Sequence, residues 1–81
     1  MDNHINAEYK TRDYAEASVL ILKNQKLIQI EREGKTCWFI FENESVCKEI
    51  SDQYFFGELL LNAREFKEAM DRLKSRIFAK I

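Results

Sequence analysis

Hydrophobic and polar positions alternate most regularly between residues 26 and 42, KLIQIEREGKTCWFIFE. Two runs with a period of two flank a polar turn that contains Glu33-Gly34, and this combination predicts an antiparallel β-hairpin. If these two residues are central in the turn, one face of the hairpin carries Ile28, Ile30, Cys37, Phe39 and Phe41. We expect that face to form the core. A longer loop would change the pairing partners but not the alternation within each strand.

The opposite face of the predicted hairpin is polar beside the turn and apolar at its far end, where it carries Leu27, Trp38 and Ile40. Left in water, these side chains would present on the order of 300–400 Å² of apolar surface, comparable to the largest patch on a typical monomer. This surface could be covered in two ways, either by the chain's own first helix or by a protein partner, most simply a second copy. Leu27, Trp38 and Ile40 are therefore the candidate partner-binding residues.

The first predicted helix precedes the hairpin. Asp13, with Glu16 three residues later, matches a capping box, and Asn24 suits a left-handed stop after Leu22. Residues 19–22 are all apolar and would pass for a strand if taken alone. The helix must therefore be buried on most sides or unwind in its last turn.

Two further helices are predicted after the hairpin. Asn43 can cap the first, and Gly57 supplies the left-handed residue after its end. Asn62 begins the second, whose apolar stripe has helical spacing and consists of Phe66, Ala69, Met70, Leu73 and Ile77. Residues 59–61, between the two helices, either add a short third strand to the hairpin edge or form a buried connector.

The predicted fold is a single small α+β domain over residues 11–81, with the order α-β-β-α-(β)-α and a central antiparallel β-hairpin packed by helices. Residues 1–10 are polar and lack periodicity, so we expect a flexible N-terminal arm that Ile5 and Tyr9 could each pin to the domain. The 81 residues are near the size at which a single core becomes marginal.

Charge is distributed unevenly along the chain. Residues 1–61 hold 7 Lys/Arg against 11 Asp/Glu, whereas residues 62–81 hold 6 against 3. The basic side chains of the last helix are candidates for phosphate contacts to nucleic acid: Arg64, Lys67, Arg72, Lys74 and Arg76. The overall pI of about 5.8 argues against this function. Retention on nucleic acid at low salt would distinguish it from protein binding.

Catalytic and metal-binding residues are not suggested by the sequence. His4 is the only histidine, it lies in the predicted arm, and no glycine-rich phosphate loop is present. The carboxylates of the hairpin are scattered acids of an ordinary polar surface. We therefore expect no enzyme activity, no cofactor and no metal site.

Cys37 and Cys47 are ten residues apart and lie beside apolar neighbours, so buried free thiols are expected. The N-terminus shows no apolar leader segment, and no run approaches the length of a membrane span. We expect a cytoplasmic protein.

Three stretches together resemble a known family. They are YKTRDYAEASVLILKNQKLIQIEREGKTCWFIFE, a helix ending at FFGE, and LLLNAREFKEAMDRLKSRIF. This arrangement over residues 9–78 resembles a family of small bacterial and phage-associated proteins catalogued as a domain of unknown function. The resemblance implies a shared fold and a bacterial or mobile-element source, and it implies nothing about mechanism.

The sequence thus predicts a non-catalytic protein–protein interaction module, which could form a homodimer through the outer face of the hairpin. The alternative is a nucleic-acid-associated accessory protein that uses the basic C-terminal helix.

Overall fold

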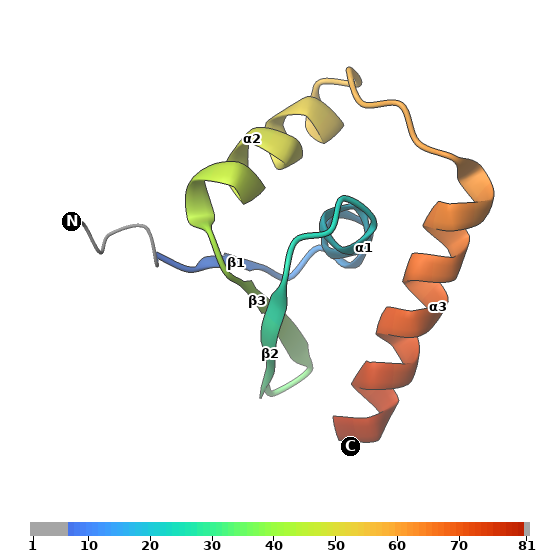
Figure 1. Cartoon of the computed structure of the whole chain (residues 1–81). Helices are drawn as coiled ribbons and strands as arrows, with labels where there is room; N and C mark the ends of the chain where they lie inside the picture. Colours follow the sequence, from blue (N-terminus) through green and yellow to red (C-terminus); the bar gives the residue numbers. More distant parts are fainter. Residues whose placement is uncertain (1–6, 81) are drawn as a thin grey trace.

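The computed structural model describes residues 7–80 (Figure 1). Its elements follow in the order β1 (Tyr9–Thr11), α1 (Tyr14–Leu22), β2 (Leu27–Glu33), β3 (Thr36–Phe41), α2 (Glu44–Phe55) and α3 (Ala63–Lys80). The described residues combine three helices with a three-stranded antiparallel sheet, which confirms the α+β class and the central hairpin.

The third strand comes from the N-terminal end of the chain. The sheet order is β1-β3-β2, and Tyr9 pairs with Phe41 across the edge of β3 that the hairpin leaves open. Tyr9 and Lys10, which we expected in a flexible arm, therefore lie in a strand. Residues 1–6 of that arm lie outside the described residues. Residues 59–61 form no strand, and Leu60 is 91% exposed, so this segment is not a buried connector either.

The hairpin turn lies one residue later than the sequence pattern suggested. Gly34 and Lys35 form the turn, with Glu33 opposite Thr36 and Ile30 opposite Phe39. Gly34 has a φ of 63°, a conformation that glycine adopts without steric cost.

The strand β2 is irregular between Leu27 and Gln29, and this changes which side chains reach the core. An extra residue at a bulge reverses the alternation of faces beyond it. Leu27 consequently packs against the core, whereas Ile28 is 41% exposed. The assignment of Ile28 to the core face and of Leu27 to the outer face was therefore wrong. Ile30, Phe39 and Phe41 are buried in the core as expected.

The start and end of α1 follow its local sequence. The side chain of Asp13 accepts a hydrogen bond from the backbone N–H of Glu16 at 3.0 Å, and Asn24 adopts a left-handed φ of 66°. The reciprocal half of the capping box does not form, because the N–H of Asp13 donates to the hydroxyl of Thr11 instead. All residues from 16 to 20 are buried, so the apolar run is a helix surrounded on most sides.

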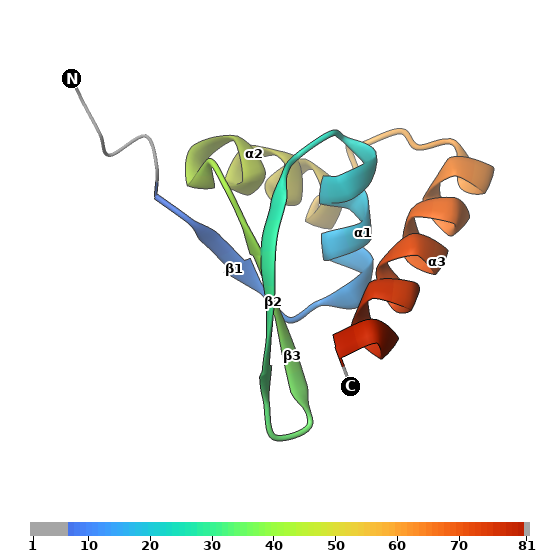
Figure 2. The same ribbon diagram turned by 60° about the horizontal axis from the view of Figure 1, so that its bottom comes forward.

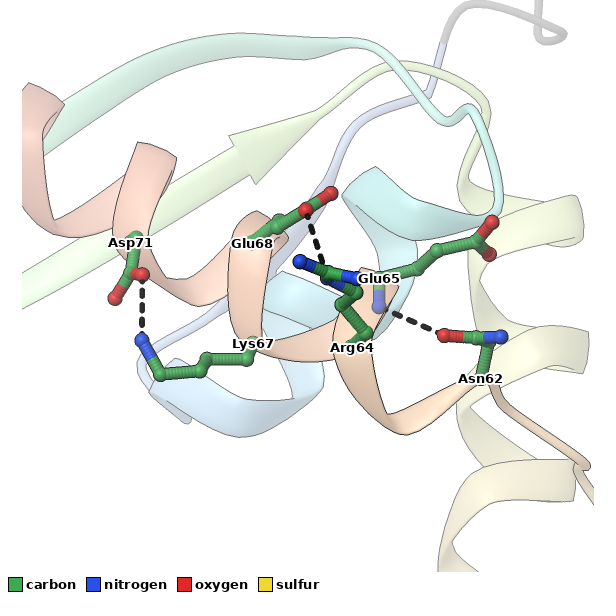
Figure 3. Close-up of polar contacts among 6 residues, drawn as sticks. All are labelled: Asn62, Arg64, Glu65, Lys67, Glu68 and Asp71. Carbon is green, nitrogen blue, oxygen red and sulfur yellow. Dashed lines mark hydrogen bonds and ion pairs between the residues drawn. The ribbon is translucent and has the colours of Figure 1, made fainter.

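The predicted caps of the other two helices are also confirmed. The side chain of Asn43 accepts from the N–H of Val46 at 3.4 Å, and Gly57 follows α2 with a φ of 73°. The side chain of Asn62 accepts from the N–H of Glu65 at 3.0 Å at the start of α3 (Figure 3).

Helix α1 lies at the centre of the fold, with the sheet, α2 and α3 arranged around it (Figure 1). The buried cluster draws on all of these elements and consists of Ala17, Leu20, Ile30, Phe39, Phe41, Cys47 and Leu73. Helix α3 has 18 residues and α1 has 9. At 1.5 Å per residue their lengths are about 27 Å and about 14 Å, so one end of α3 extends past α1 and runs beside the hairpin (Figure 2).

Candidate functional site

A groove of about 550 Å³ lies where α3 extends past α1. One wall is α3, the other is the hairpin, and the segment at the start of α1 closes one side. The apolar part of the lining is shared by all three and consists of Tyr14, Cys37, Phe39, Met70, Ile77 and Phe78. We call this hollow the groove.

Helical spacing explains how α3 both packs and lines the groove. Ala69 and Leu73 are fully buried, and they hold the first part of α3 against the rest of the fold. Met70 and Ile77 lie on the adjoining stripe, which is turned toward the hairpin. The hydroxyl of Tyr14 donates to the carbonyl of Met70 and ties the start of α1 to α3. Burial raises the pKa of this hydroxyl, with the charge of Asp71 adding to the effect.

The rim of the groove is cationic. Arg12, Lys35, Lys67 and Lys74 line it together with one carboxylate, Asp71, so four cations against one anion leave a net charge of +3. Lys67 donates to Asp71 at 2.9 Å (Figure 3), and this hydrogen bond raises the pKa of Lys67. Both partners are largely exposed, so this pair contributes little to folding. The groove is thus an apolar floor under a positive rim.

The five basic residues proposed for nucleic-acid contact are divided between different sides of α3. Lys67 and Lys74 line the groove, whereas Arg76 lines a separate hollow beside Ile28. With 3.6 residues per turn, Lys74 and Arg76 point about 200° apart around the helix. Arg72 is exposed, and Arg64 lies 3.8 Å from the carboxylate of Glu68 (Figure 3). The structure therefore does not gather these cations into one basic face.

The three candidate partner-binding residues of the hairpin differ in how exposed they are. Leu27 packs against the core that α1 helps to form, and Ile40 is only 3% exposed. Trp38 is half-buried, and its indole N–H donates to the carboxylate of Glu33 at 3.2 Å. They do not form the exposed apolar patch that the sequence suggested. Their role in binding stays a prediction.

An exposed apolar segment lies instead at the connection between α2 and α3. Phe55, Phe56 and Leu60 are 59%, 78% and 91% exposed. The ring of Phe55 lies 5.0 Å from that of Tyr54, in a tilted arrangement. We call Phe55, Phe56 and Leu60 the ridge. The sequence does hold a sign of this exposed segment, because more apolar residues surround Gly57 than one stripe of a helix can bury.

Beneath the sheet, the carboxylate of Glu16 forms a buried polar cluster. Glu16 is 4% exposed and accepts hydrogen bonds from three hydroxyls, those of Tyr9 at 2.5 Å, Thr11 at 2.6 Å and Ser51 at 2.5 Å. These residues come from β1, α1 and α2, so the cluster joins three elements at one point. Sequence reasoning assigned Glu16 only to a helix cap, because partners as far as 35 residues away cannot be read from local spacing.

The neighbours of Glu16 are held in their protonated forms. Burial, followed by the hydrogen bond to Glu16, raises the pKa of Tyr9 to about 12. Burial, followed by the charge of Glu16, raises the pKa of Cys47 to about 11. The phenol therefore acts as a donor at neutral pH, and the thiol of Cys47 is a poor nucleophile. The cluster is organised to stabilise the fold.

The two cysteines should differ in reactivity. Cys47 is fully buried with a raised pKa, whereas Cys37 is half-buried at the floor of the groove. We expect a neutral maleimide to label Cys37 in the folded protein. Cys47 should be labelled at least 100-fold more slowly, because only the small fraction of molecules that unfold locally exposes its thiol. Mass spectrometry of timed samples measures this. Equal rates for the two thiols under native conditions would contradict the placement of Cys47.

No cluster of three or more His, Cys, Asp or Glu side chains suited to a metal ion occurs within residues 7–80. His4 lies outside that range. Among the helices of the same range, none has the length and apolar character needed to cross a membrane. Comparisons with protein-family models, with characterised proteins and with solved structures find no match for this chain.

Proposed function

We propose that this chain is a non-catalytic protein–protein interaction module and that the groove is its recognition site. The observation that carries the proposal is the combination of an apolar floor with a rim of net charge +3. An apolar concavity with a few placed polar groups is the usual form of a binding site. A protein segment with apolar side chains and flanking carboxylates matches it in both respects.

The nucleic-acid alternative is supported less well by the positions of the cations. Only Lys67 and Lys74 of the five candidate residues line the groove. A phosphate backbone needs a continuous track of cations, since its affinity depends on the number of phosphates neutralised. Our proposal includes a cytoplasmic location, which agrees with the two free thiols. It also includes the bacterial or phage source that the family resemblance implies.

The proposal can be tested by placing a photo-reactive phenylalanine analogue at position 78. Phe78 lines the groove and is exposed, so the replacement is small and faces any occupant. We expect illumination of cells that express this chain to yield a discrete protein adduct, either with itself or with another protein. Reversal of the rim charges with Lys35→Glu and Lys74→Glu should lower its yield at least fivefold, because the complementary charge is lost.

Two controls make this result specific. Lys26→Glu changes an exposed cation outside the groove lining and should leave the yield unchanged. The same analogue at Trp38 reports on the outer hairpin face. An adduct with nucleic acid would support the alternative function. A protein adduct at position 38 with none at position 78 would reject the groove as the recognition site.

A further inference from the structure

We propose that the partner in the groove is a second copy of this chain, which inserts its ridge of Phe55, Phe56 and Leu60. This inference rests on the proposed function, because it names the occupant of the same groove. It follows from the shape, the charge and the placement of the two surfaces.

The ridge is the most exposed apolar feature among the described residues. A phenylalanine side chain buries on the order of 150–250 Å² when it is covered, so the exposed parts of these three residues present about 400 Å² of apolar surface. An apolar area of this size is comparable to the largest patch on a typical monomer, and such patches are often functional. The groove is the described hollow with an apolar floor large enough to accept aromatic side chains.

The charges of the two surfaces are opposite. Asp52 and Glu58 are exposed and lie beside the ridge in the chain. They are the only charged residues between positions 52 and 63, so the segment around the ridge carries a net charge of −2. The rim of the groove carries +3. Seating the ridge in the groove therefore brings opposite charges together around an apolar contact.

The positions of the ridge and the groove allow two copies to form a closed, symmetric dimer. The ridge lies just before the start of α3, and α3 lines the groove from Lys67 to Phe78. Two copies with antiparallel α3 helices would each offer the ridge to the groove of the other, which is the arrangement of a two-fold dimer.

The first test is the mass of the protein in solution by light scattering over a range of concentrations. We expect the wild type to form a dimer that dissociates on dilution. Phe56→Ser should raise the dissociation constant by about tenfold or more, as expected for an aromatic residue at the centre of an interface. Circular dichroism of the same sample shows whether the variant is folded. Trp38→Ser tests the outer hairpin face instead, and we expect it to leave the dissociation constant unchanged.

The second test reverses the charges of one surface at a time. A groove-reversed chain carries Lys35→Glu and Lys74→Glu. A ridge-reversed chain carries Asp52→Lys and Glu58→Lys. Each chain alone places like charges together in both contacts and should be monomeric. An equimolar mixture should recover the dimer, because both contacts of the mixed pair then join opposite charges.

Different failures have different meanings. A dimer that persists in Phe56→Ser but dissociates in Trp38→Ser would overturn the ridge contact in favour of the outer hairpin face. A monomeric wild type, or a mixture that remains monomeric, would overturn the second copy as occupant. In either case a groove-dependent adduct between position 78 and another protein would leave the proposed function intact.

Discussion

Replacing Glu16 by alanine is expected to lower the free energy of unfolding by about 3–5 kcal/mol. Its carboxylate is buried and accepts from the hydroxyls of Tyr9, Thr11 and Ser51. Removing the acceptor leaves these donors without a partner, at a cost of about 1–3 kcal/mol for each buried group. A small domain has a total stability of about 5–15 kcal/mol, so this single change would bring the protein close to unfolding at room temperature.

Urea unfolding followed by circular dichroism measures this effect. Glu16→Gln is the closest variant in shape, and we expect an intermediate loss because one acceptor oxygen is replaced by an amide donor. Glu49→Ala removes an exposed carboxylate from α2 and should change stability by less than about 0.5 kcal/mol. If Glu16→Ala were as stable as Glu49→Ala, the buried cluster would not contribute to the fold.

Ser51→Ala provides a further check on the cluster. In a double-mutant cycle the effects of Glu16→Ala and Ser51→Ala should be strongly non-additive, since both remove the same hydrogen bond. Additive effects would show that the two side chains act independently.

Replacing Phe41 by alanine is expected to lower the free energy of unfolding by about 3–5 kcal/mol, the usual cost of truncating a buried aromatic side chain. Phe41 is fully buried and belongs to the central strand β3, where it is paired with Tyr9 on one side and Leu27 on the other. The cavity left by its ring lies at the junction of all three strands. Neighbouring side chains that are held on both sides have little freedom to fill it.

The chain offers a chemically matched control for Phe41. Phe56→Ala removes the same side chain from a position that is 78% exposed, and it should change stability by less than about 0.5 kcal/mol. The measurement should use a low protein concentration, because dissociation of a dimer on dilution would otherwise add to the difference. Equal losses for the two variants would contradict the packing of the sheet.

The helices could be predicted from the sequence because their ends are encoded within a few residues. Each helix begins with a side chain that accepts a hydrogen bond from the N–H three residues later, and these capping residues are Asp13, Asn43 and Asn62. Such a bond depends only on residues in the first turn of the helix. The hairpin could be predicted for a similar reason, since alternation and a turn glycine are local features. Its register could not, because the turn lies at Gly34-Lys35, one residue later than the pattern suggests. The irregularity in β2 also places Leu27 rather than Ile28 in the core, and local alternation carries no sign of it.

The first strand was missed because a three-residue segment is too short to show a period. Tyr9–Thr11 becomes a strand only because β3 offers a free edge and Glu16 binds the hydroxyls of both Tyr9 and Thr11. The candidate site was missed for a related reason. The groove joins Arg12, the hairpin and α3, so its lining comes from positions up to 66 residues apart.

By itself the sequence determined the α+β class, the three helices with their caps, and the presence of a hairpin. These features depend on interactions between residues close together in the chain. Only the tertiary structure decided the third strand, the partners of Glu16 and the groove beside α3. They depend on how elements of unequal length pack. Helix α3 is twice as long as α1, and the part of α3 that α1 does not cover lines a groove with an apolar floor and a cationic rim.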